Sequence, residues 1–199
     1  MITVYCRRLG YCLAALLLGA AAGYGQGLGS GEASLGYTFL RANAPPGQCG
    51  CFNMNGLSGE FAAGLGHGFS VVADLGGDHQ GNVTGSGQSL WVVNYLFGPR
   101  LSYRRSKRWT PFAQFLVGGA RGSGTLFGTA ATSSSAATSG SANGFALSTG
   151  GGLDFNATQH FAIRLFQLEY FNTRLPNSVN GVQNNLRWTA GVVFRFGKK

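Results

Sequence analysis

Charged residues are scarce in this sequence, which argues against an ordinary soluble domain. Asp, Glu, Lys and Arg together make up 11% of the 199 residues, and only six residues are acidic. An average soluble domain has about 25% charged residues. Glycine and aromatic residues are abundant instead, at 34 residues and 13% of the chain. This composition is typical of a protein with an apolar exterior and a closely packed backbone.

Long hydrophobic runs are almost as rare. A membrane-spanning helix needs about 20 apolar residues, and the mean hydropathy here is only +0.07. The sequence therefore excludes a bundle of transmembrane helices. The one compact apolar stretch runs from Leu13 to Ala22 and follows Arg7 and Arg8. A basic region, a short apolar region and then small residues predict a secretory signal peptide.

The predicted signal peptide covers residues 1–25, with cleavage after Gly25 or, as an alternative, after Ala22. Residues 26–199 then form the exported part, whose length is that of a single domain. Because export leads to an oxidising compartment, cysteines in this part are expected to be oxidised rather than kept as thiols.

Only two cysteines, Cys49 and Cys51, lie in the exported part, separated by Gly50. A Cys-x-Cys pair can close a small strained disulfide, bind a soft metal or take part in redox exchange. Metal binding needs further ligands, and only His79 is expected in another loop on the same side. We therefore favour a loop disulfide between Cys49 and Cys51 and predict no metal site.

Signatures of enzymes and cofactor sites are missing. Glycine-rich segments such as Gly64 to Gly68 lack the lysine and the helix of a phosphate loop. The three histidines do not form a catalytic constellation, because His67 and His160 fall in predicted turns and His79 in a loop at the other end. We predict no catalytic residue and no cofactor, and hence no enzyme.

Nucleic acid is also excluded as a partner. The formal net charge is +9, and four basic residues are close together, at Arg104, Arg105, Lys107 and Arg108. A nucleic-acid surface needs such a patch on a soluble domain with base-stacking aromatics among the basic residues. A short basic turn in an exported protein is better explained by contact with anionic lipid or with the periplasm.

The exported part contains eight segments in which apolar and polar residues alternate, the pattern of half-buried strands. Most are near the 9–11 residues with which a tilted strand crosses a bilayer. The segments are Ala33–Arg41, Leu57–Leu65, Phe69–Leu75, Leu90–Tyr103, Thr110–Ala120, Phe145–Phe155, Phe161–Phe171 and Leu186–Phe196.

The connections between these segments alternate in length. Short turns are expected at residues 66–68, 104–109 and 156–159, and long loops at 43–56, 77–88, 122–143 and 173–184. Outer-membrane barrels have short periplasmic turns and long extracellular loops. The sequence thus predicts an all-β fold, an eight-stranded antiparallel up-and-down transmembrane β-barrel.

Six charged residues occupy the face that would point into this barrel, where acids and bases can pair across a narrow lumen. They are Glu60, Asp74, Arg100, Asp154, Arg187 and Arg195. Two interpretations are open: a polar path for small solutes, or a filled core. An eight-stranded interior is just wide enough for side chains, so we favour the filled core.

Two places do not fit a polar interior. Leu90, Val92 and Leu96 lie on the predicted inner face, which requires either a bulge in that strand or a partly apolar lumen. In the strand from Phe161, strict alternation puts Arg164 and Glu169 on opposite faces. We expect Glu169 to face inward and Arg164 to reach the membrane interface near the periplasmic turn, where a basic residue costs about 0–1 kcal/mol.

The last strand carries the most specific motif, a polar residue, a glycine and two aromatics at Thr189, Gly191, Phe194 and Phe196. It resembles the C-terminal signal by which outer-membrane barrels are recognised for insertion. With the signal peptide, the alternation and the loop asymmetry, the chain resembles the OmpA-like and OmpX-like eight-stranded barrels over nearly all of Glu32 to Phe196.

This resemblance implies location in the bacterial outer membrane, contact with outer-membrane lipid and with the barrel-assembly machinery, and a monomer or weak oligomer. Roles in such barrels range from envelope integrity to surface interaction through the extracellular loops. Two alternatives are a secreted lipocalin-like carrier of a small apolar ligand and a narrow channel for very small solutes. A soluble carrier would need charges where this chain has Trp91, Phe97 and Trp188.

Overall fold

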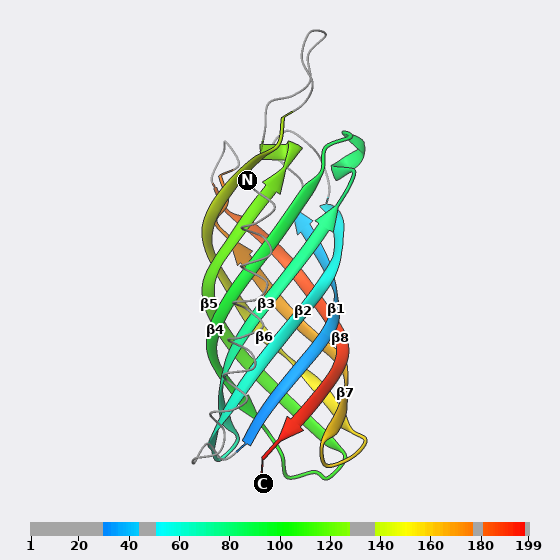
Figure 1. The fold of residues 1–199 in the computed structure, drawn as a ribbon, viewed down its shortest axis with the longest axis vertical. Helices are drawn as coiled ribbons and strands as arrows, with labels where there is room; N and C mark the ends of the chain where they lie inside the picture. Colours follow the sequence, from blue (N-terminus) through cyan, green and yellow to red (C-terminus); the bar gives the residue numbers. More distant parts are fainter. Residues whose placement is uncertain (1–29, 44–50, 128–137, 177–180, 198–199) are drawn as a thin grey trace, which may run out of the picture.

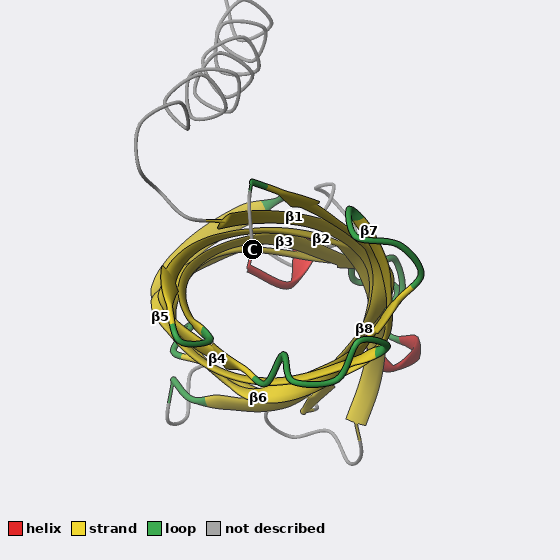
Figure 2. Cartoon of the chain, turned by 90° about the horizontal axis from the view of Figure 1, so that it is seen from below, coloured by secondary structure: helices red, strands yellow, loops and turns green. Residues whose placement is uncertain are grey.

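The computed structural model describes residues 30–43, 51–127, 138–176 and 181–197, which form eight β-strands and two short 3₁₀ helices. The strands are β1 (Ser30–Asn43), β2 (Cys51–Gly66), β3 (Phe69–Gln80), β4 (Leu90–Ser102), β5 (Trp109–Gly124), β6 (Gly140–Asn156), β7 (Phe161–Thr173) and β8 (Gln183–Phe196). The helices are η2 (Val83–Gly85) and η3 (Thr125–Phe127). Each strand pairs antiparallel with the next, and β1 pairs with β8. The predicted barrel is confirmed (Figures 1 and 2).

Several strands extend further than their alternation predicted. Pairing continues to Asn43 opposite Cys51 and to Gly124 opposite Gly140, in segments that the sequence assigned to loops. The extra pairs lie at the end of the long connections (Figure 1). Their outward side chains are largely polar, as at Asn53 and Ser141, so this part of the wall is suited to water rather than lipid.

The outer wall below this polar part is apolar. In β4 every second residue is exposed, and Tyr95 and Phe97 are 55% and 60% exposed. Aromatic side chains bracket the band at both ends, with Trp91 against His79 at one end and Trp109 against Phe155 at the other. Aromatic girdles around an apolar band are the exterior of a strand that crosses a bilayer.

The prediction for Arg164 is wrong. Its side chain is 3% exposed and points into the barrel, as does that of Glu169. The cause is a β-bulge in β7: Arg164 opposes Gly191 and Gln167 opposes Thr189, so two residues of β7 face one of β8. An extra residue of this kind reverses the alternation beyond it.

Leu90, Val92 and Leu96 face inward because part of the lumen is apolar, not because of a bulge. The register of β4 is unbroken on the β3 side, and all three residues belong to an apolar cluster of interior side chains. Val83 of η2 joins this cluster with no exposed surface, and Leu126 and Phe127 of η3 pack against it. The lumen is therefore apolar toward the long connections.

Some predictions fall outside the described residues. The signal peptide, residues 1–25, lies there, and so does Cys49. Cys51 is exposed at the start of β2, so the loop disulfide stays a prediction. Within the described ranges, no helix has the length and hydropathy to span a membrane.

Candidate functional site

The centre of the lumen is organised around Glu60 on β2. Its carboxylate forms ion pairs with Arg100 of β4 and Arg164 of β7. The amides of Gln114 and Gln167 donate to its other oxygen at 3.0 and 2.9 Å. A buried carboxylate loses its hydration, so it is stable only with such compensation.

A second cluster surrounds Arg187 of β8. Its guanidinium lies 2.7 Å from a carboxylate oxygen of Asp74 and 2.7 Å from one of Glu169. Asn94 donates to Asp74 at 3.2 Å, and Ser148 donates to Glu169 at 2.8 Å. Gln114 also donates to Glu169, at 2.9 Å, and thereby joins this cluster to the one around Glu60.

A third group continues the network to the end with the short turns. Arg164 donates to Asp154 at 2.9 Å, and Arg195 lies 3.5 Å from the same carboxylate. Arg195 and Arg104 both contact Glu32, at 2.6 and 2.8 Å. All six residues predicted to face the lumen thus belong to one network, which runs from the β4–β5 turn to Asp74.

Aromatic rings in the lumen support the arginines. The guanidinium carbons of Arg100 and Arg164 lie 4.6 and 4.5 Å from the centroid of the Phe112 ring. That of Arg187 lies 5.2 Å from the Phe171 ring. A cation over an aromatic face is stabilised, more so when both are desolvated. The rings thus fill space between charges and strengthen the packing.

The interior contains four ionisable residues besides the six of the predicted charged set, namely Glu32, Asp78, Arg164 and Glu169. Glu169 was expected inside without a role, and Arg164 was misplaced for the reason given above. Glu32 was missed because it precedes the first alternating segment, and Asp78 because it lay in an expected loop. Both could have been assigned to the interior by alternation, because Glu32 has the same parity as the inward Ser34, and Asp78 the same parity as the inward Asp74. Asp78 accepts a hydrogen bond from Thr38.

The filled lumen leads to a prediction about conductance. Buried side chains occupy the centre, and apolar side chains close the lumen toward the long connections. Purified protein in planar bilayers is therefore expected to give little or no steady current. Large, stable currents like those of a porin would contradict the filled core and favour the narrow channel.

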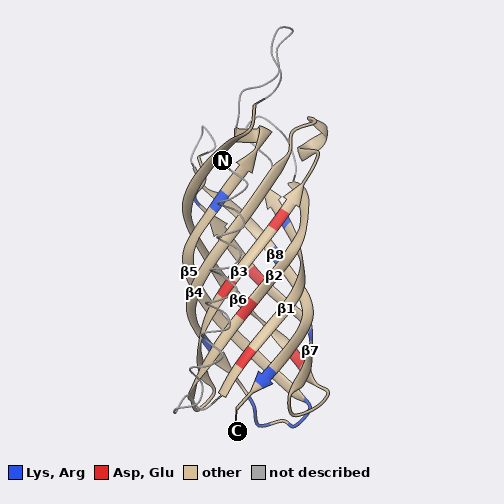
Figure 3. Ribbon diagram, in the orientation of Figure 1, with Lys and Arg blue, Asp and Glu red and all other residues tan. Residues whose placement is uncertain are grey.

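Charge is divided sharply between the interior and the exterior. The chain has six acidic residues, and all six are buried in the lumen. The exposed charged residues of the described chain are arginines and lysines only. They lie at the two ends of the barrel. Arg41 and Arg121 are near the ends of β1 and β5 and Arg174 follows β7, all toward the long connections. The others are in the β4–β5 turn at the opposite end, where Figure 3 shows basic residues at the bottom of the barrel.

The four residues of the assembly-type motif have separate structural roles in β8. Thr189 is buried in the lumen, whereas Phe194 and Phe196 are 48% and 51% exposed on the outer wall. Gly191 lies at a close approach to β1, because a Cβ there would come within 2.1 Å of the Leu35 carbonyl oxygen. The motif therefore lies on the strand that closes the barrel and supplies rings to the outer wall at the end with the short turns.

Comparison with known proteins supports the fold. A scan against protein-family models finds no match, nor does a search of the curated proteins. Among solved structures, the attachment invasion locus protein Ail of Yersinia pestis is similar with a TM-score of 0.58 and 18% identity over 84% of this chain and 99% of that one. Neisserial surface protein A gives 0.61 and 11% identity over 84% and 99%. The N-terminal barrel of Pseudomonas aeruginosa OprF gives 0.51 and 13% over 86% and 100%.

At these low identities, the likeness establishes the fold alone. The outer wall also carries an exposed apolar band with aromatic rings at both ends, which is the exterior of a membrane-spanning barrel. The chain has the fold of the eight-stranded barrels of the bacterial outer membrane, and its outer wall has the apolar band of a barrel that spans a membrane.

Proposed function

We propose that the protein is a non-enzymatic surface-interaction barrel whose extracellular rim binds anionic polysaccharide. The observation that carries this proposal is the separation of charge: every carboxylate is buried in the lumen, and only cations are exposed. In outer-membrane barrels the long connections face outward. An anionic polymer approaching the cell therefore meets Arg41, Arg121 and Arg174 without any acidic residue to repel it.

Two of these arginines flank the same strand, β6. Arg121 of β5 opposes Asn143 of β6, and the backbone N–H of Arg174 donates to Phe145 on the other side of β6 at 2.8 Å. Both are exposed. Two guanidinium groups on either side of one strand, with the polar Asn143 between them, can contact successive sulfates or phosphates of a polymer.

A structural neighbour provides independent support. Ail of Yersinia pestis has been solved in complex with sucrose octasulfate, a heparin analogue, with a TM-score of 0.56 and 16% identity to this chain. That complex concerns Ail alone. It does indicate that a barrel of this architecture can bind a sulfated sugar.

The proposal is tested on intact cells that carry the protein in their outer membrane. Fluorescent heparin is expected to bind, neutral dextran is not, and added salt should weaken the binding because the contact is ionic. Three exposed ionic contacts together contribute about 1.4 kcal/mol, which is a factor of about ten in affinity. Changing Arg41, Arg121 and Arg174 together to glutamine should therefore lower the affinity for heparin about tenfold.

A matched variant removes the same number of charges at the other end, by changing Arg105, Lys107 and Arg108 to glutamine. In intact cells these residues are predicted to face the periplasm, so heparin binding should be unchanged. Equal loss in both variants, or binding of heparin that resists salt and the rim substitutions, would show that the rim is not the binding surface.

Three further parts of the proposal concern biogenesis and activity. Residues 1–25 are removed as a signal peptide, and the barrel-assembly machinery inserts the chain through its last strand. No catalytic activity is proposed, because His67, His79 and His160 lie on different connections or strands. The lipocalin-like carrier is disfavoured, because interior apolar side chains pack against one another and the outer wall is apolar.

A further inference from the structure

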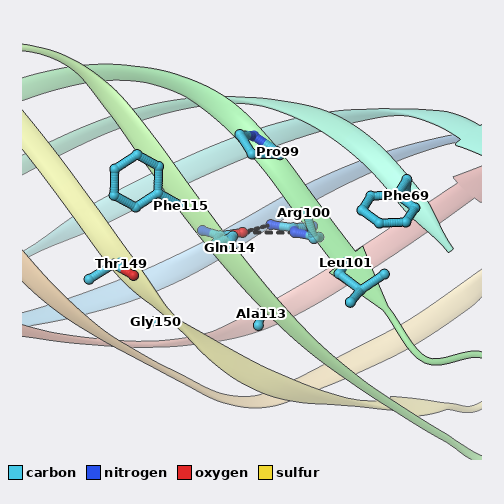
Figure 4. A pocket seen from close by; sticks show the side chains of 9 residues that line it. All are labelled: Phe69, Pro99, Arg100, Leu101, Ala113, Gln114, Phe115, Thr149 and Gly150. Carbon is cyan, nitrogen blue, oxygen red and sulfur yellow. Dashed lines mark hydrogen bonds between the residues drawn. The ribbon is translucent and has the colours of Figure 1, made fainter.

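The outer wall contains a shallow hollow of about 400 Å³ across β3, β4, β5 and β6. Small residues form its floor, because Ala113 of β5, which lies opposite Leu101, and Gly150 of β6 both line it. Phe69 and Leu101 border it at one end and Phe115 at the other (Figure 4). The β4–β5 ladder is interrupted beside it at Pro99, which has no N–H to donate.

The hollow lies in the half of the barrel near the short turns. Ala113, which lies opposite Leu101, is four residues after Trp109, where β5 begins, and a strand rises about 3.3 Å per residue at a tilt near 45°. The hollow therefore begins about 10 Å above the β4–β5 turn. The apolar band of an outer-membrane barrel is about 25 Å tall, so one leaflet contributes about 12 Å. The hollow is at the depth of acyl chains in the periplasmic leaflet.

The turn below the hollow is strongly basic. Arg104 is engaged by Glu32, whereas within the described part of the chain Arg105, Lys107 and Arg108 are exposed and form no ion pair. The other two short connections, residues 67–68 and 157–160, contain no lysine or arginine. The cations of the short turns are therefore concentrated beneath β4 and β5, the middle two of the four strands across which the hollow lies.

We propose that the hollow and the β4–β5 turn form one binding site for an anionic phospholipid of the periplasmic leaflet. The anionic headgroup, with its phosphate, contacts Arg105, Lys107 and Arg108, and an acyl chain occupies the hollow between Phe69 and Phe115. The two features match such a lipid in order and in spacing, with the cations at the headgroup level and the hollow at the depth of its chain. This site is independent of the polysaccharide rim, which lies at the opposite end.

The site is tested with the purified full-length barrel in detergent, titrated with dioleoylphosphatidylglycerol or dioleoylphosphatidylethanolamine and analysed by native mass spectrometry. The wild type should bind phosphatidylglycerol with at least about tenfold higher affinity than phosphatidylethanolamine. The reason is that each basic residue near a membrane raises the affinity for anionic lipid about fivefold. Equal retention of the two lipids would overturn the proposal.

Two variants separate the headgroup contact from the chain contact. Changing Arg105, Lys107 and Arg108 to glutamine should abolish the preference between the lipids. Ala113→Phe fills the hollow with an apolar ring that the membrane tolerates, so it should lower the retention of both lipids.

Ala73→Phe is the matched control for Ala113→Phe, since Ala73 is an exposed alanine on the outer wall of β3 that does not line the hollow. It should bind both lipids like the wild type. If Ala113→Phe and Ala73→Phe behaved alike, the hollow would not be the chain-binding part and the proposal would be wrong.

Discussion

Glu60→Met is expected to lower the free energy of unfolding by about 3–5 kcal/mol, because it leaves Arg100 and Arg164 buried without their shared carboxylate. Arg164 keeps Asp154 as a partner, but Arg100 keeps only the neutral Gln114. The loss is measured by urea unfolding of the barrel in lipid vesicles, followed by tryptophan fluorescence.

A second substitution distinguishes an unpaired charge from a general packing defect. Adding Arg100→Met to Glu60→Met removes the orphaned cation, so the double variant should be less destabilised than the sum of the two single changes. A coupling of about 0.5–3 kcal/mol is expected for residues in one network. Additive effects, or a Glu60→Met barrel as stable as the wild type, would show that the lumen is hydrated enough to solvate the arginines.

The architecture could be predicted from the sequence because alternation is a local signal. β4 shows this best, since its outward and inward residues follow strict parity over the whole strand. The apolar interior residues Leu90 and Val92 were correctly placed by parity, although their environment was not known. Their role became clear only with Val83, which reaches them from a loop.

The members of the charged network could be predicted from the sequence, but not which of them contact one another. Glu60 and Arg164 are 104 positions apart, and their contact depends on the registers of several strand pairs together. The bulge at Leu165 and Phe166 was not predicted, because both residues are apolar and lack the glycine that marks some bulges. Without the bulge, alternation sends Arg164 to the lipid side.

The ends of the strands were the least predictable part. Cys51 to Gly56 was assigned to the long loop at residues 43–56, although apolar and polar residues alternate there as they do in a strand. The structure shows that Phe52 and Met54 face inward in this segment, and that Asn53 and Asn55 face outward. A strand above the membrane reverses the usual pattern, with apolar residues inside and polar residues outside.

A charge at the middle of the apolar band is expected to be costly, whereas one at the rim is not. Val192 of β8 opposes Leu35 of β1 and Ile163 of β7, and both neighbours are exposed on the outer wall. Val192→Arg therefore places a cation among acyl chains and should lower the free energy of unfolding in lipid vesicles by about 2–4 kcal/mol. Asn43→Arg introduces the same side chain at an exposed position at the far end of β1, where a cost of about 0–1 kcal/mol is expected.

The difference in stability between the two variants measures the depth of each position in lipid, since both add one arginine to a strand of the same sheet. Two equally stable variants would mean that this face of the barrel does not contact acyl chains, and the soluble carrier would then explain the fold better than a membrane protein does.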